Sequence, residues 1–177
     1  MHLSLIAAMG QNRALGLNGR LPWPPLPEDW ANLHRITAGR KMIMGRKSYE
    51  TPDRVSSPVG NLVITRQDRY SVEPGFEIVH TLEEALERYR DEEEVFVLGG
   101  AEIFQRTLPL AGTLHLTVIH SPFEADAFFP DFDEKAFTEV SRHDYPADDR
   151  HPFAYTFFVY ERKNKDDYAA TAILGRL

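Results

Sequence analysis

A single carboxylate, Asp29, stands near the predicted start of an amphipathic helix, directly behind a tryptophan and a proline-rich turn. Residues 21–29 read Leu-Pro-Trp-Pro-Pro-Leu-Pro-Glu-Asp, and Pro27 suits the first position of a helix. A carboxyl group in an apolar pocket has a raised pKa, because desolvation disfavours its charged form. Asp29 could therefore hold or relay a proton near neutral pH. The alternative is that Glu28 and Asp29 only favour the positive end of the helix.

Two further segments place glycine between a predicted strand and a predicted helix. Gly99 and Gly100 follow an apolar run, where backbone N–H groups and the helix dipole can receive a pyrophosphate. A Gly-Gly pair often makes only a tight turn, and this one lacks the GxGxxG spacing of the Rossmann fold. The second segment, residues 44–48, reads Met-Gly-Arg-Lys-Ser and adds two cations, which could equally be exposed basic side chains.

Arg66 ends a third segment, in which Ile64-Thr65-Arg66 brings a hydroxyl and a guanidinium to the end of a predicted strand. Guanidinium groups form charge-assisted, bidentate hydrogen bonds with phosphate. Arg46 and Arg66 together could recognise an additional phosphate, such as the one that distinguishes NADP from NAD.

The elements that must position these residues alternate between strand and helix. Hydrophobic periodicity and end signals predict helices at 27–38, 46–50, 81–90 and 101–108, the third opened by a Thr-Leu-Glu-Glu capping box. They predict strands at 3–9, 41–44, 61–65, 76–80, 95–98, 113–120, 137–145 and 153–162. The last three strands have no helical pattern between them. We therefore predict an α/β fold with a central mixed sheet of about eight strands, about four flanking helices and a C-terminal antiparallel hairpin.

Length and composition narrow the function classes. The 177 residues predict one domain at 1–163 with a C-terminal tail at 164–177, where 168–174 is a short apolar segment. The net charge of -7 argues against general nucleic-acid binding, and no apolar run is long enough to span a membrane. The chain has no cysteine, and its seven histidines form no pair at metal-ligand spacing. We expect no metal site, and we expect a cytoplasmic monomer.

Taken in order, the segments resemble the dihydrofolate reductase family over nearly the whole chain, from residue 3 to residue 162. The resemblance rests on 4–8 (Ser-Leu-Ile-Ala-Ala), 13–16 (Arg-Ala-Leu-Gly), 21–23 (Leu-Pro-Trp), 27–29 (Pro-Glu-Asp), 43–50 (Ile-Met-Gly-Arg-Lys-Ser-Tyr-Glu), 99–104 (Gly-Gly-Ala-Glu-Ile-Phe), 116–117 (Leu-Thr) and 126–130. It implies NADPH-dependent reduction of 7,8-dihydrofolate to 5,6,7,8-tetrahydrofolate, with hydride delivered to C6 and N5 protonated by way of water.

The resemblance also implies roles for individual residues. Asp29 would bind the pterin 2-amino group and N3, Thr117 would support that contact, and Trp23 would hold an ordered water. The implied substrate-binding residues are Ile6, Ala8, Asp29, Trp30, Leu33, Pro52, Arg54, Leu98 and Thr117. The implied NADPH-binding residues are Ala8, Leu15, Gly16, Gly19, Leu21, Gly45, Arg46, Lys47, Ser48, Thr65, Arg66, Leu98, Gly99, Gly100, Ala101, Glu102, Ile103 and Phe104.

Two further features follow from the same resemblance. The peptide bond between Gly99 and Gly100 is expected to be cis. The loop 10–20, rich in glycine and asparagine, is expected to act as a lid. Asp126 would hold this lid through backbone N–H groups, the alternative being an ordinary exposed turn residue.

The sequence departs from the family pattern at the position expected to bind the folate carboxylates. The family usually carries an arginine there, and the aligned residue is Val59. Arg54, Arg35 or His34 could substitute for it. Trp30 also follows Asp29 where an aliphatic residue is common, one residue is added after the tryptophan of the proline-rich turn, and alanine replaces a third glycine at 101.

Two other functions remain open from the sequence. One is a related NADPH-dependent pterin or pyrimidine reductase, as in riboflavin synthesis; that group lacks the arrangement of Asp29, Trp23 and Thr117. The other is a non-catalytic pteridine binder, which the absent arginine supports and the retained Asp29 opposes.

Overall fold

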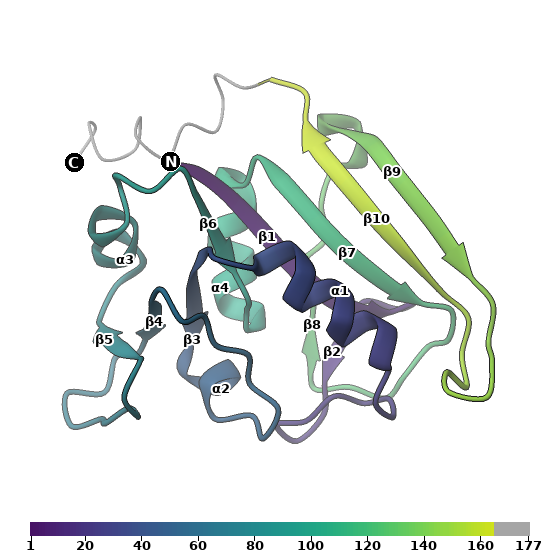
Figure 1. The fold of residues 1–177 in the computed structure, drawn as a ribbon, viewed down its shortest axis with the longest axis horizontal. Coiled ribbons are helices and arrows are strands. Elements are labelled where there is room, and N and C mark those ends of the chain that lie inside the picture. The colour runs from purple at the N-terminus through teal and green to yellow at the C-terminus, as the bar shows by residue number, and fades with distance from the viewer. Residues whose placement is uncertain (165–177) are drawn as a thin grey trace.

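The computed structural model describes residues 1–164, so the predicted tail from residue 165, including 168–174, lies outside the described residues. One eight-stranded sheet has the order β5-β4-β3-β6-β1-β7-β10-β9 (Figure 1). Its strands are β1 (His2–Gly10), β3 (Lys41–Gly45), β4 (Asn61–Ile64), β5 (Glu77–Val79), β6 (Glu94–Val97), β7 (Thr113–Ile119), β9 (Phe137–Tyr145) and β10 (Tyr155–Arg162). Two short strands, β2 (Ala14–Gly16) and β8 (Ala127–Phe128), pair separately.

Four α-helices flank the sheet, as predicted. They are α1 (Pro27–Thr37), α2 (Arg46–Tyr49), α3 (Leu82–Arg88) and α4 (Ala101–Thr107). The capping box at α3 is confirmed in part: the Thr81 side chain accepts a hydrogen bond from the N–H of Glu84 at 3.0 Å, while the Glu84 carboxylate accepts from His80.

Alternation along the strands separates two faces of the sheet. On one face Leu3 and Leu5 of β1 belong to a buried cluster that includes residues of α3 and α4. On the other face Thr117 of β7 reaches α1, which crosses the front of the sheet in Figure 1. Because strand side chains alternate between faces, residues 4, 6 and 8 of β1 share the α1 face.

Parallel pairing brings the strand ends together. β1 pairs in parallel with β6 and β7, and β3 pairs in parallel with β4 and β6. Carboxyl ends of parallel strands meet at one edge of an open α/β sheet, where ligands commonly bind. The predicted glycine segments, at 45 and 99–100, therefore meet at this edge. β10 pairs antiparallel with both β7 and β9, which confirms the predicted hairpin.

The differences from the predicted elements are small. β2 and β8 are only three and two residues long, too short for a periodic pattern, and two 3₁₀ turns at Leu108–Leu110 and Glu134–Ala136 were also not predicted. The observed β10 begins at Tyr155, two residues later than predicted. Within residues 1–164, no helix has the length and apolar character needed to cross a membrane.

Candidate active site

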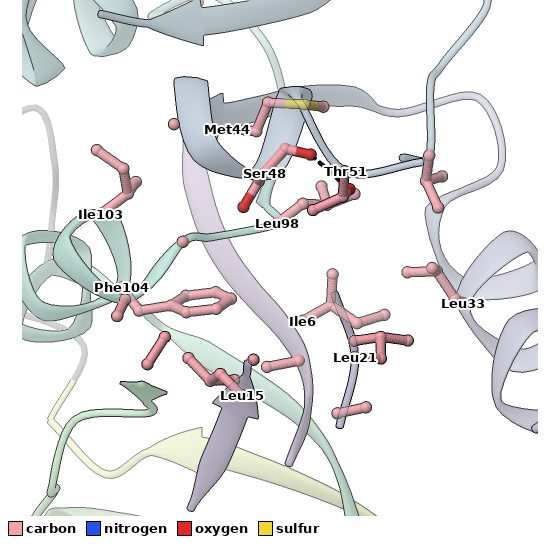
Figure 2. Close-up of a pocket in the computed structure, with 18 of the residues that line it drawn as sticks. Ile6, Leu15, Leu21, Leu33, Met44, Ser48, Thr51, Leu98, Ile103 and Phe104 are labelled. Atoms are coloured by element: carbon pink, nitrogen blue, oxygen red, sulfur yellow. Dashed lines mark hydrogen bonds between the residues drawn. The ribbon is translucent and has the colours of Figure 1, made fainter. Parts of the chain in front are cut away.

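A cavity of about 1840 Å³ lies at the carboxyl edge of the parallel strands. Figure 2 shows that its walls come from separate elements, with Leu33 on α1, Ser48 on α2, and Ile103 and Phe104 on α4. Ile6 of β1 and Leu98, just after β6, complete an apolar region between these helices.

Asp29 lies in the first turn of α1 and lines this cavity. The hydroxyl of Thr117 donates a hydrogen bond to its Oδ1 at 2.6 Å. Burial raises the pKa of Asp29, and the hydrogen bond from Thr117 lowers it by a smaller amount. The result is one carboxyl group in an apolar cavity, with a pKa raised above its ordinary value and its orientation fixed by a neighbouring strand.

Most of the predicted site residues line this one cavity. The substrate-side residues that do so are Ile6, Ala8, Asp29, Trp30, Leu33, Pro52, Leu98 and Thr117. The cofactor-side residues that do so are Leu15, Gly16, Gly19, Leu21, Gly45, Arg46, Lys47, Ser48, Thr65, Arg66, Gly100, Ala101, Glu102, Ile103 and Phe104. Trp23, Arg54 and Gly99 are the predicted residues that do not line it.

Trp23 is buried behind the cavity wall. It forms a cluster with Leu26, Ile119 and Tyr155, and its ring packs edge-on against Phe123 with centroids 5.4 Å apart. The structure therefore places Trp23 in the packing that supports the start of α1.

Arg54 is turned toward the protein rather than toward the cavity. Its guanidinium lies over the rings of Tyr49 and Phe76, at 4.6 and 5.5 Å from their centroids, and forms an ion pair with Glu73. Val59, the aligned position of the family's arginine, is exposed. Of the three cations considered as substitutes, Arg35 lines the cavity, whereas Arg54 and His34 do not.

The glycine segments touch one another where the predicted cofactor region begins. The N–H of Gly45 donates to the carbonyl of Gly99 at 2.6 Å, and the Gly99–Gly100 peptide bond is cis, as predicted. A Cβ at 45 would lie 2.9 Å from Ile103 Cγ1, and one at 99, where φ is +108°, would lie 2.9 Å from Phe104 Cε2. Such distances are too short for a side chain, so glycine is required at both positions.

The two predicted phosphate-binding arginines lie at the exposed rim. Arg46 Nη1 is 2.9 Å from both carboxylate oxygens of Glu50, and Arg66 Nη2 is 3.8 Å from Glu102 Oε2. The sequence reasoning missed neighbouring lining residues, namely Gln67, His80, Thr81 and Arg106. For His80 and Gln67 the available signal was their place just after the strands β4 and β5. These two strands pair in parallel, and His80 Nδ1 lies 2.9 Å from the Thr65 carbonyl.

The loop 10–20 contacts the distant turn that precedes β8. Asp126 Oδ2 accepts a hydrogen bond from the Asn18 N–H at 2.9 Å, and the Asp126 N–H donates to the Gly16 carbonyl at 2.9 Å. The expected contact between Asp126 and this loop is therefore present, and pairing of β2 with β8 extends it.

Comparisons with known proteins agree with this arrangement. A family model described as dihydrofolate reductase matches residues 2–162. The dihydrofolate reductase of Bacillus subtilis (strain 168) is 38% identical over 162 residues, which cover 92% of this chain and 95% of that protein. The dihydrofolate reductase of Staphylococcus haemolyticus is 34% identical over 162 residues, covering 92% and 96%.

A solved structure shows the same fold. Dihydrofolate reductase from Enterococcus faecalis, complexed with NADP(H) and RAB-propyl, has a TM-score of 0.83 and 28% identity. The match covers 92% of this chain and 97% of that one. With a family model over nearly the whole chain, relatives above 30% identity and this fold, the chain belongs to the dihydrofolate reductase family.

Proposed function

We propose that this protein catalyses the NADPH-dependent reduction of 7,8-dihydrofolate to 5,6,7,8-tetrahydrofolate, which feeds one-carbon metabolism. The observation that carries the proposal is the carboxyl group of Asp29, held by Thr117 in the cavity that also contains the glycine segments. The family, and a structural relative complexed with NADP(H), support the same reaction and the same cofactor.

The chain's own residues fit a nicotinamide dinucleotide. Gly45 and Gly100 bring bare backbone to the cavity wall, and a Cβ at 45 would press against Ile103, which lines the same cavity. Arg46 and Arg66 at the rim supply guanidinium groups for the extra phosphate of NADPH. When bound, NADPH would supply the hydride that reaches C6 of the pterin.

The apolar walls and Asp29 would provide the remaining chemistry. Ile6, Leu33 and Leu98 exclude bulk water from the reacting atoms, which strengthens electrostatic interactions inside the cavity. The Asp29 carboxylate would bind the pterin 2-amino group and N3, and its charge would favour protonation at N5 by way of water. Thr117 keeps the carboxylate facing the substrate.

The folate carboxylates need a cation other than the family's usual arginine. Arg54 is occupied by Glu73 and two aromatic rings, so we assign the carboxylates to Arg35, which lines the cavity. We also infer that residues 1–163 act as one domain, and that the protein is a cytoplasmic monomer without affinity for nucleic acid, in keeping with its net charge of -7.

A direct assay tests the reaction. The loss of NADPH absorbance that accompanies its oxidation should require both the protein and dihydrofolate. Turnover of a pyrimidine or another pterin, with none of dihydrofolate, would instead indicate the related reductase. Binding of dihydrofolate with no turnover would indicate the non-catalytic binder.

The contact made by Asp126 leads to a prediction about the loop 10–20. Asp126→Ala should preserve the fold, weaken NADPH binding and slow hydride transfer, because the closed loop loses a charge-assisted hydrogen bond worth roughly 1.5–3 kcal/mol. Stopped-flow hydride transfer and NADPH titration measure both effects. Asp91→Ala is the control, because Asp91 is an exposed carboxylate that pairs with Arg90 and lies outside both the loop and the cavity. Wild-type values for Asp126→Ala in both assays would leave Asp126 without a role in closure.

A further inference from the structure

The helix that carries Asp29 has no capping side chain of its own. Its N-cap residue is Leu26, whose side chain cannot accept a hydrogen bond. The first N–H groups of any helix need acceptors from outside the helix. Here the N–H of Glu28 donates to Nε2 of His151 at 3.3 Å, across 123 positions of sequence. The cap of α1 therefore comes from the turn between β9 and β10, which lies beside the N-terminal end of α1 in Figure 1.

The turn holds His151 in one orientation. Its side chain is buried, with only 1% exposed, and its Nδ1 lies 2.8 Å from Oδ1 of Asp148. The same oxygen accepts hydrogen bonds from the N–H groups of Arg150 and His151, each at 2.8 Å. A backbone bridge between Asp148 and His151 closes the turn.

The two contacts of the ring determine where its proton lies. A backbone N–H can only donate, so Nε2 must be the acceptor toward Glu28. A neutral imidazole then carries its proton on Nδ1, which donates it to the Asp148 carboxylate. The cap therefore requires His151 to be neutral and in this single tautomer.

We propose that His151 is a positioning residue for Asp29: from the β9–β10 turn, and in its neutral form, its ring accepts the hydrogen bond that caps the first turn of α1. The proposal rests on the function proposed above for Asp29. Glu28, which receives the cap, directly precedes Asp29 in the first turn of the helix.

Two distant contacts thereby hold the first turn of α1. Thr117 on β7 binds the side chain of Asp29, and His151 binds the backbone of Glu28. β10, which follows the turn, pairs with β7 so that Phe157 lies opposite Thr117. One contact therefore comes from β7 and the other from the turn that leads into its neighbour β10, and together they set how far the Asp29 carboxylate stands from the sheet.

Protonation of His151 would remove this cap. The cation has no acceptor on Nε2, and it would place positive charge at the positive end of α1. The charged and titratable residues next to the ring are Asp148 and Arg150 on the same turn, Glu28 on α1 and Tyr155 on β10. Beyond them, Asp29 directly follows Glu28 on α1, and Tyr145 of β9 stacks against Tyr155.

Amide and imidazole NMR of the protein without ligands tests the cap independently of activity. In the wild type, the Glu28 amide resonance should shift with pH at the same midpoint as the His151 ring. In His151→Gln, whose Oε1 can replace Nε2 as acceptor, that midpoint should vanish. Arg150→Ala, which removes only the ion pair with Glu28, should keep it. A Glu28 amide that stays unchanged while the His151 ring titrates overturns the proposal.

Kinetics with dihydrofolate and NADPH test the positioning role. His151→Leu should lower kcat/KM for dihydrofolate by a factor of at most about five to thirty, the upper limit set by the stability that a lost helix cap removes. The KM for NADPH should stay within about twofold of wild type, and His151→Gln should restore most of the loss. A folded His151→Leu with wild-type kinetics, or a loss that His151→Gln does not rescue, contradicts the role. Should His151→Leu not fold, His151→Gln and the NMR titration still decide it. If the wild type does not turn over dihydrofolate, the proposed function fails while the NMR test of the cap stands.

Discussion

Asp29→Asn is expected to lower the rate of dihydrofolate reduction by about 10²- to 10⁴-fold at neutral pH, the range typical of a lost general acid or base. The asparagine keeps the shape of the side chain and can still accept the hydrogen bond from Thr117. It removes the negative charge that favours protonation of the substrate at N5. Single-turnover hydride transfer at pH 7 measures the effect.

The pH dependence of this variant separates a proton role from a binding role. At low pH part of the substrate is already protonated, so the activity of Asp29→Asn should recover partly as the pH falls. Asp53→Asn changes an exposed carboxylate on the rim of the same cavity and should stay within about twofold of wild type. A near wild-type rate for Asp29→Asn at neutral pH would show that the assigned role is wrong.

The raised pKa of Asp29 also predicts that Asp29→Asn, although it lowers activity, increases the stability of the fold at neutral pH. Because the folded pKa lies above the unfolded one, the folded state binds this proton more tightly than the unfolded state does. The stability contributed by Asp29 is therefore lost as pH rises from the unfolded pKa, near 3.9, through the folded pKa. Asp29→Asn should raise Tm at pH 7, with a difference that shrinks on acidification. A variant less stable than wild type at pH 7 would contradict this reasoning.

The double variant Arg46→Ala, Arg66→Ala is expected to lose most of the preference for NADPH over NADH. Charge-assisted hydrogen bonds to phosphate are roughly twice as strong as neutral ones, and NADH lacks the phosphate they would bind. The ratio of kcat/KM for the two cofactors measures the preference, and use of NADH should be spared.

The present partners of these arginines affect the size of that loss. Arg46 pairs with Glu50, and Arg66 lies near Glu102. Each guanidinium would therefore either bind the phosphate and its carboxylate together or leave the carboxylate for the phosphate. Arg88→Ala is the matched control, because Arg88 pairs with Glu77 and does not line the cavity. An unchanged cofactor ratio in the double variant would exclude both arginines from phosphate recognition.

Local sequence patterns were sufficient for the main elements of this fold. Apolar runs predicted all eight strands of the large sheet, and Thr81 marked the start of α3 through a bond to a residue three positions away. These signals arise from side-chain periodicity and from contacts within one turn, so they need no knowledge of the rest of the chain. β2 and β8 exist only because they pair with each other, and no local pattern marks them.

The family, and with it the reaction, followed from the order of short motifs along the sequence, and most of the residues that the resemblance implied line one cavity. The surroundings of those residues did not follow from the sequence. Arg54 was considered for the folate carboxylates, yet it is bound by Glu73 and covers Tyr49 and Phe76. Whether a guanidinium faces a cavity or a neighbouring ring depends on packing that the residue type does not specify.

The sequence by itself determined that Asp29 stands in the first turn of a helix and that Pro27 begins it. Only the tertiary structure decided what fixes that carboxylate, because its partners are remote: Thr117 lies 88 positions away from Asp29, and His151 lies 123 positions away from Glu28. The pKa of Asp29 is likewise set by burial among several elements. Local patterns record helix and strand preference, whereas desolvation and capping across the chain exist only once the strands have paired and α1 has packed against them.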